Sequence, residues 1–170
     1  KLRVALFFGG VSSEHEVSCV SASTWLRALA QATCADRYEV FPVGITKQGR
    51  WLACSPTPEA MADGSWEKGA DCTPCVLSPD RTDHGIWLLK DGKAELVHID
   101  ICAPVMHGKN GEDGTIQGLF ELARIPYVGC GVLGSAVCMD KAVANTIMDA
   151  AGVPHCKWAS AIRAELEGDH

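Results

Sequence analysis

The chain contains one polar stretch whose residue types suit the binding of a small charged ligand. Residues 107–118 have the sequence His-Gly-Lys-Asn-Gly-Glu-Asp-Gly-Thr-Ile-Gln-Gly, in which Gly108, Gly111 and Gly114 are spaced three apart among basic, amide and acidic side chains. Glycine lets the backbone approach a ligand closely or adopt a positive φ. The two acids precede an expected helix N-terminus, whose dipole favours negative charge. The spacing predicts a ligand-binding loop, in which His107 is either a hydrogen-bonded core histidine or a residue of the site.

A buried strand and an amphipathic helix are expected on the two sides of this loop. Residues 101–106 are an apolar run typical of a strand. After the loop, apolar residues recur with helical spacing at Ile116, Leu119, Phe120 and Ala123. Open α/β sheets bind their ligands where the carboxyl end of a strand leads into a helix. The loop is therefore expected at the ligand-binding rim of a sheet.

A second candidate loop follows the first strand of the chain. Residues 2–8 form a continuous apolar run, typical of a strand covered on both faces, and Gly9-Gly10 ends it. Ser13 and Glu16 have the spacing of a helix-capping box, whereas Glu14 is either a solvated charge at a helix start or a ligand contact. The loop lacks the G-x-G-x-x-G pattern of dinucleotide-binding proteins, which argues against a Rossmann-type oxidoreductase.

The remaining pattern alternates between strands and helices. Further strands are expected at 38–45, near 51, at 86–90, at 93–97 and at 125–129. The Asp91-Gly92 pair between two of them is a strong signal for a hairpin. Residues 54–85 have no clear period and are expected to be irregular, apart from a short helix at 58–62. The predicted fold class is α/β, an open and mostly parallel Rossmann-like sheet with flanking helices and an antiparallel hairpin at one edge.

The sequence also predicts two longer helices and the exposure of most histidines. The first helix is expected to bury Val17, Val20, Ser21, Thr24 and Ala28. The second is capped by Ser135 and stopped by Gly152 and Pro154. It is expected to bury Ala136, Met139, Val143, Ile147 and Ala150. Residues 159–170 are acidic and helix-permissive. Five histidines without an evident partner are expected at the surface: His15, His84, His98, His155 and His170.

Composition and charge exclude several classes of protein. The 170 residues are 47% hydrophobic and 21% charged, as in an ordinary soluble globular protein. A formal net charge of −6 argues against nucleic acid or an anionic membrane as the main partner. No apolar run reaches the roughly 18 residues of a membrane helix. The nine cysteines are expected to be reduced thiols, which predicts a cytoplasmic location.

Two of the cysteines have the C-x-x-C spacing of redox and metal-binding motifs. Cys72 and Cys75 are separated by two residues, as in redox and zinc motifs, but no second pair follows at a suitable distance. They also lie in a stretch rich in Gly, Asp and Pro instead of at a strand-to-helix junction. We interpret the spacing as a coincidence, and no metal site is predicted.

Two motifs of this chain resemble those of a known enzyme family. Residues 8–18 are similar to the opening motif of the D-alanine–D-alanine ligases, and residues 107–118 are similar to that family's second signature. The second motif continues through Glu121, 125–129, Ser135-Ala136 and Met139-Asp140-Lys141. The resemblance extends in order from Val4 to about Pro154. Residues 43–47 and the insert after them are most like the branch that includes the glycopeptide-resistance ligases, which make D-alanyl-D-lactate or D-alanyl-D-serine.

The resemblance implies an ATP-grasp ligase of peptidoglycan precursor synthesis. In that family, ATP and Mg²⁺ serve to phosphorylate the carboxylate of a first D-alanine, and a second D-amino acid or D-hydroxy acid attacks the acyl phosphate. The resemblance makes Glu14 a catalytic and substrate-binding residue that holds the ammonium group of the first D-alanine. It places His107 beside the same substrate and Lys141 at the ATP phosphates. Family members are commonly homodimers through the first domain.

The resemblance also implies more domains than these residues provide. Residues 1–129 are expected to form the N-terminal α/β substrate-binding domain, and 130–170 the helical start of the central ATP-grasp domain. The Mg²⁺ ligands and the loop that selects the second substrate would then lie outside this chain, which we expect to be an inactive fragment by itself. Asn145 replaces a second lysine of many members, which weakens the expectation for Lys141. A non-catalytic binding module is the alternative function.

Overall fold

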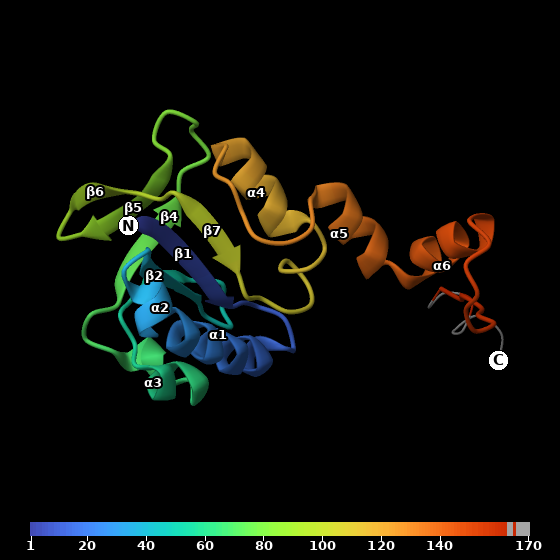
Figure 1. Ribbon diagram of the computed structural model, residues 1–170, viewed down its shortest axis with the longest axis horizontal. Coiled ribbons are helices and arrows are strands. Elements are labelled where there is room, and N and C mark those ends of the chain that lie inside the picture. The colour runs from blue at the N-terminus through green and yellow to red at the C-terminus, as the bar shows by residue number, and fades with distance from the viewer. Residues whose placement is uncertain (163–164, 166–170) are drawn as a thin grey trace.

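In the computed structural model, which describes residues 1–162 and 165, seven strands form one open sheet (Figure 1). The strands are β1 (Leu2–Gly9), β2 (Tyr38–Ile45), β3 (Trp51–Ala53), β4 (Thr73–Leu77), β5 (Gly85–Lys90), β6 (Lys93–His98) and β7 (Ile101–Pro104). Their order across the sheet is β6-β5-β4-β3-β2-β1-β7. β1 is parallel to both of its neighbours, β2 and β7. The carboxyl ends of these three strands therefore lie at the same edge of the sheet.

The predicted α/β class with an open sheet and flanking helices is confirmed, but the prediction of a mostly parallel sheet is wrong, because four of the six pairings between the described strands are antiparallel. The antiparallel part runs from β2 through β3, β4 and β5 to β6, instead of being limited to the edge hairpin. The reason is β4, which forms inside the stretch predicted to be irregular and joins the hairpin to β3. The hairpin itself is confirmed, with positive φ at both turn residues, Asp91 and Gly92.

Helices cover both faces of the sheet (Figure 1). The helices are α1 (His15–Leu29), α2 (Ala32–Ala35), α3 (Pro58–Ala62), the 3-10 helix η1 (Ser65–Lys68), α4 (Thr115–Ala123), α5 (Val132–Met139) and α6 (Lys141–Ala150), of which α5 and α6 extend away from the sheet (Figure 1). The short helix predicted at 58–62 is confirmed, and the Thr57 side chain caps it by accepting the Ala60 N–H. Thr57 thus fixes where this helix begins.

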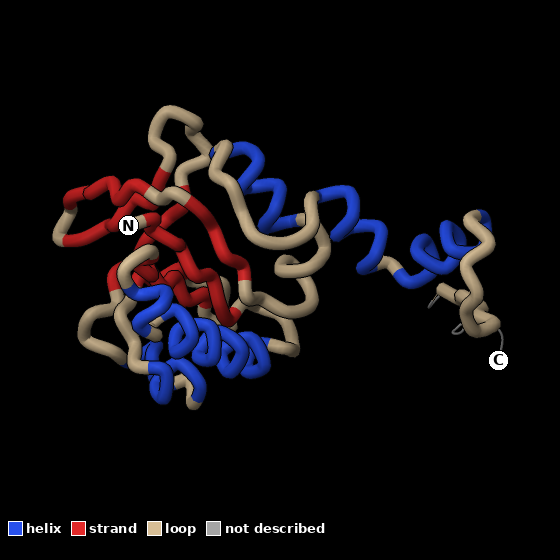
Figure 2. The backbone as a smooth tube through the Cα atoms, in the orientation of Figure 1, coloured by secondary structure: helices blue, strands red, loops and turns tan. Residues whose placement is uncertain are grey.

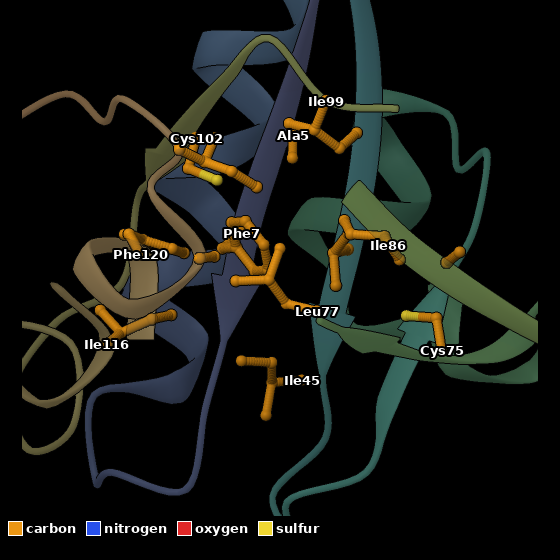
Figure 3. Close-up of a cluster of buried hydrophobic side chains, with 14 of the residues drawn as sticks. Ala5, Phe7, Ile45, Cys75, Leu77, Ile86, Ile99, Cys102, Ile116 and Phe120 are labelled. Atoms are coloured by element: carbon orange, nitrogen blue, oxygen red, sulfur yellow. The ribbon is translucent and has the colours of Figure 1, made fainter. Parts of the chain in front are cut away.

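Alternate side chains of β1 enter two separate hydrophobic cores, as expected for a strand covered on both faces. Phe7 points to the α4 side, where its ring centroid lies 5.2 Å from that of Phe120 (Figure 3). Phe8 points to the α1 side and packs edge-on against Trp66, with 4.8 Å between ring centroids. Because β1 contributes to both cores, its position is fixed from both sides.

The buried face of α1 differs from the predicted one. The residues that it buries are His15, Ser18, Cys19, Ala22 and Ser23. Val17 and Val20 were expected inside but are each 53% exposed, and Thr24 and Ala28 are exposed as well. The reason is a buried hydrogen-bond pair: the Ser18 hydroxyl accepts the Gly9 N–H at 2.8 Å and donates to the Val105 carbonyl. A small polar residue therefore replaces an apolar one at the contact between α1 and the strands.

The predicted capping box is wrong. α1 begins at His15, and its N-cap residue Glu14 makes no side-chain cap bond. The Glu16 carboxylate instead forms an ion pair with Lys47, on the loop after β2. The Ser12 hydroxyl, one residue before the predicted cap Ser13, accepts the Glu14 N–H at 3.1 Å. A distant lysine therefore binds the Glu16 carboxylate that the local pattern had assigned to the box, and Ser12 instead of Ser13 accepts an N–H at the start of the helix.

The prediction that the histidines without a partner lie at the surface is wrong for His15. It is 4% exposed, and its Nδ1 lies 2.7 Å from the Gly10 carbonyl oxygen. His84 and His155 are half-buried and have partners, the Ile99 carbonyl and the Asp149 carboxylate respectively. His98 is exposed, as predicted. His170 lies outside the described residues, as does most of the helix-permissive stretch at 159–170.

The single helix predicted after Ser135 is also wrong, because two helices meet at Asp140. The Asp140 carboxylate accepts the N–H groups of Ala142 and Val143 and so begins α6 as a new helix. Ser135 lies inside α5 and donates to the Cys130 carbonyl. Five residues expected to be buried by this helix are exposed: Ala136, Met139, Val143, Ile147 and Ala150. They are exposed because α5 and α6 extend away from the sheet (Figure 2).

The short strand expected at 125–129 is reduced to one parallel bridge between Cys102 and Tyr127. The Cys102 N–H donates to the Pro126 carbonyl, and the Val128 N–H donates to the Cys102 carbonyl. The segment therefore extends the sheet beyond β7 by only a single residue pair.

We expect Ser18→Ala to lower the free energy of unfolding by about 2–3 kcal/mol, because it leaves the buried Gly9 N–H and Val105 carbonyl without a partner. Urea denaturation measures this change. Ser13→Ala is the matched control, since Ser13 is exposed and caps no helix, and its change should stay within about 0.5 kcal/mol. An equal loss in both variants would contradict the proposed role of Ser18.

Candidate functional site

The two candidate loops meet at the carboxyl ends of the neighbouring strands β1 and β7. The Ser12 hydroxyl joins them, because it donates to the His107 carbonyl at 2.8 Å while accepting the Glu14 N–H. Ser12 and His107 are 95 residues apart in the chain. The loop that follows β1 therefore lies against the loop that follows β7, as the shared rim predicted.

Glu14 and His107 come together through the glycine beside His107. A Cβ atom placed on Gly108 would lie 2.3 Å from the Glu14 Oε2 atom, and Gly108 has a φ of +69°. The positive φ favours glycine at this position, and any other residue would also displace the Glu14 carboxylate from the place that it occupies here. The carboxylate of Glu14 is exposed and lies directly against the loop that carries His107.

The imidazole of His107 is held between two polar side chains. Its Nε2 lies 3.0 Å from the hydroxyl of Ser21 on α1, and its Nδ1 lies 3.6 Å from the Glu112 Oε1 atom. The other carboxylate oxygen of Glu112 accepts the Gly108 N–H at 2.8 Å. The His107 ring is therefore oriented by α1 and by its own loop, and its side chain is about one-third exposed.

The end of the second loop is shaped by Asp113. Its carboxylate accepts the N–H of Asn110 at 2.8 Å and that of Thr115, the first residue of α4, at 3.0 Å. Burial by itself raises the pKa of Asp113, but the hydrogen bonds from Asn110 and Thr115 outweigh it and hold the pKa below its usual value. The expectation that an acid precedes this helix N-terminus is confirmed, and Asp113 does so while also fixing the loop.

A cleft of about 490 Å³ opens beside this rim, between the sheet domain and α5 and α6. His107, Glu112 and Gln117 contribute to one side, and Ser135 and Lys141 to the other. The Lys141 ammonium group is exposed and donates to the Cys138 carbonyl at 3.1 Å. The structure thus places His107 and Lys141 at one cleft, whereas Glu14 is not among the residues that line it.

Sequence reasoning missed the residues that orient the site. Ser12 from the first motif and Ser21 from α1 bind His107, and Glu112 holds the backbone of Gly108. Ser12 and Glu112 had only their membership of the two motifs as a local signal, and Ser21 had none, because the bonds of the two serines to His107 span 95 and 86 residues.

The two closely spaced cysteines do not share a site. The Cys72 thiol donates to the Trp66 carbonyl at 3.1 Å, and Cys75 is buried in the core on the α4 side. Within residues 1–162 and 165, no group of three or more His, Cys, Asp or Glu side chains is placed to hold a metal ion. In the same part of the chain, none of the helices has the length and hydropathy of a membrane span.

Comparison with known proteins identifies similar sequences. The family model described as "D-ala D-ala ligase N-terminus" matches residues 3–130. A D-alanine–D-alanine ligase of Caldicellulosiruptor bescii is 49% identical over 91% of this chain and 40% of its own length. The vancomycin B-type resistance protein VanB of Enterococcus faecalis is 45% identical over 90% of this chain and 42% of its own length.

Solved structures of similar proteins have the same fold. The VanG D-Ala:D-Ser ligase of Enterococcus faecalis matches with a TM-score of 0.81 and 38% identity, over 89% of this chain and 42% of that one. The D-alanine–D-alanine ligase of Coxiella burnetii matches with a TM-score of 0.81 and 32% identity, over 99% of this chain and 47% of that one. This chain spans less than half the length of each of these four relatives.

The role of Asp113 predicts a pH dependence of stability. Its pKa is lowered in the folded state, so its carboxylate stabilises the fold above the unfolded pKa of about 3.9 and loses this contribution as the pH falls through the folded value. We therefore expect Asp113→Asn to be less stable than the wild type at neutral pH, with a difference that shrinks toward low pH. Denaturation at a series of pH values measures it, and a difference independent of pH would contradict the account.

Proposed function

Because the chain belongs to the D-alanine–D-alanine ligase N-terminus family, we propose that it forms the first-substrate site of a ligase for peptidoglycan precursors. The protein would join D-alanine to a second D-amino or D-hydroxy acid in an ATP-dependent reaction. The observation that carries the proposal is the contact of the Glu14 carboxylate with Gly108, beside His107. It assembles one anionic group and one imidazole at the rim where α/β sheets bind small ligands.

These two side chains suit the two charged ends of D-alanine. The Glu14 carboxylate is exposed and free to accept charge-assisted hydrogen bonds from an ammonium group. The His107 imidazole, with its Nδ1 edge toward Glu112 and the cleft, donates a hydrogen bond to a carboxylate oxygen. The Asp113 and Glu112 bonds to the loop backbone keep the loop that carries His107 in place before substrate arrives.

Lys141 suits the proposed ATP phosphates, because its ammonium group is exposed at the cleft that His107 also lines. ATP would supply the phosphoryl group that activates the first D-alanine carboxylate for attack by the second substrate. The described residues do not fit a magnesium site, since they contain no cluster of metal-binding side chains. The proposal therefore assigns the Mg²⁺ ligands to a part of the ligase outside these residues.

The relatives point to three second substrates. They are named as a D-alanine–D-alanine ligase, a putative D-alanine–D-lactate ligase and a D-Ala:D-Ser ligase. The proposal covers all three, because the side chains of the described rim concern the first D-alanine alone. We also propose a domain boundary between residues 129 and 130, which is supported by the family match ending at 130 and by the extension of α5 away from the sheet (Figure 1).

We further propose a cytoplasmic homodimer that pairs through the first domain. All nine cysteines are free thiols, which supports a reducing compartment. Val17 and Val20 are exposed on α1 and supply an apolar surface that a second copy of the domain would cover.

We expect Glu14→Gln to weaken D-alanine binding by about tenfold or more, because it removes a charge-assisted hydrogen bond to the ammonium group. Calorimetric titration of the chain with D-alanine measures this change. Glu16→Gln is the matched control, since Glu16 lies two residues away and pairs with Lys47 instead of facing Gly108.

Three outcomes separate the proposal from its alternatives. A loss of D-alanine affinity in Glu14→Gln alone supports the first-substrate site. Equal losses of affinity in Glu14→Gln and Glu16→Gln would show a general effect of charge. If D-alanine did not bind to the wild type, this result would contradict the proposed site and favour a non-catalytic module. ATP-dependent phosphate release with D-alanine, measured on the complete ligase, tests the reaction itself.

A further inference from the structure

The hydroxyl of Ser21 has an unusual partner for a serine inside a helix. Serine and threonine hydroxyls in a helix commonly donate back to a carbonyl of the preceding turn. In α1, Ser23 and Thr24 both do so and bond to the Val20 carbonyl. The Ser21 hydroxyl instead lies 3.0 Å from the His107 Nε2 atom, 86 residues away in the chain. This bond connects the middle of α1 directly to the rim.

The two nitrogens of His107 have different surroundings. Nδ1 faces the Glu112 carboxylate at 3.6 Å, and both His107 and Glu112 line the cleft. Nε2 faces Ser21, which does not line the cleft. A carboxylate favours a proton on the nearer nitrogen, whereas a hydroxyl is able to donate to a nitrogen that carries none. The surroundings therefore distinguish the two neutral tautomers.

We propose that Ser21 is a positioning residue that holds His107 as the Nδ1–H tautomer, with that N–H directed to the cleft. The Ser21 hydroxyl donates to the unprotonated Nε2, and the ring is thereby kept from turning over. This inference rests on the proposed function, because it names the atom of His107 that meets the carboxylate of the first D-alanine. Glu112 favours the proton on Nδ1, and its second oxygen is already occupied by the Gly108 N–H.

The separation of 3.6 Å between the His107 Nδ1 atom and the Glu112 Oε1 atom leaves the Nδ1 proton available to a ligand. It is longer than an N–H···O hydrogen bond, which has a donor–acceptor distance of about 2.7–3.2 Å. The Nδ1 proton is thus attracted by the carboxylate without being fully bound to it. A ligand oxygen that enters the cleft is able to accept this proton while the Ser21 contact stays intact.

Nitrogen-15 NMR of the histidine ring tests the tautomer directly. The ¹⁵N-labelled chain is measured at alkaline pH, where histidine rings are neutral, and His107 is assigned by its absence in His107→Asn. We expect the wild type to show a protonated Nδ1 and an unprotonated Nε2. In Ser21→Ala both ring nitrogens should move toward the average of the two tautomers, and Ser21→Thr, which keeps the hydroxyl, should match the wild type.

Thr24→Ala is the matched control, because it removes a hydroxyl from the same helix that bonds only to Val20. It should leave the His107 signals unchanged. A protonated Nε2 in the wild type would overturn the proposal, even if Ser21→Ala failed to fold. Unchanged ring nitrogens in Ser21→Ala, or equal changes in Thr24→Ala, would overturn it as well.

Titration of the same samples with D-alanine separates this inference from the proposed function. We expect D-alanine to shift the Nδ1 signal in the wild type and to bind about fivefold more weakly to Ser21→Ala, as for the loss of one hydrogen bond. The expected tautomer without any response to D-alanine would contradict the ligase site while supporting the role of Ser21 in orienting the ring.

Discussion

The parallel pairing of β1 with β7 is the constraint on which the rest of the site depends. It places the ends of two strands, nearly a hundred residues apart in the chain, next to each other at one edge of the sheet. β1 is fixed in that position because its alternate side chains are buried in two cores, with Phe7 against Phe120 and Phe8 against Trp66. Ser18 then joins both strands to α1 through its bonds to Gly9 and Val105. The two candidate loops start from this framework.

Polar contacts between the loops convert that shared edge into a defined site. Ser12 and Ser21 bind the backbone and the ring of His107, and Glu112 binds the N–H of Gly108. The positive φ of Gly108 and the absence of its side chain let the Glu14 carboxylate lie against the loop. The site is therefore organised by side chains that bind other parts of the protein, which leaves Glu14 and the Nδ1 edge of His107 for a ligand.

The sequence was informative where local chemistry decides the structure. The apolar run of β1, the Asp91-Gly92 turn and the motif around His107 each carried a signal within a few residues, and the resemblance implied that Glu14 and His107 serve the same substrate. The buried face of α1 was predicted wrongly because hydrophobic periodicity favours the valines, whereas burial of Ser18 depends on partners in two strands. The break at Asp140 was missed although aspartate is a preferred N-cap.

We propose that D-alanine binds at the rim formed by Glu14, Gly108 and His107. The most direct test is a ¹H–¹⁵N NMR titration of the chain with D-alanine and, separately, with L-alanine. We expect D-alanine to shift the signals of the Gly108 amide and the His107 ring, and L-alanine to shift them much more weakly. Equal shifts with both enantiomers, or shifts confined to residues away from the ends of β1 and β7, would contradict it.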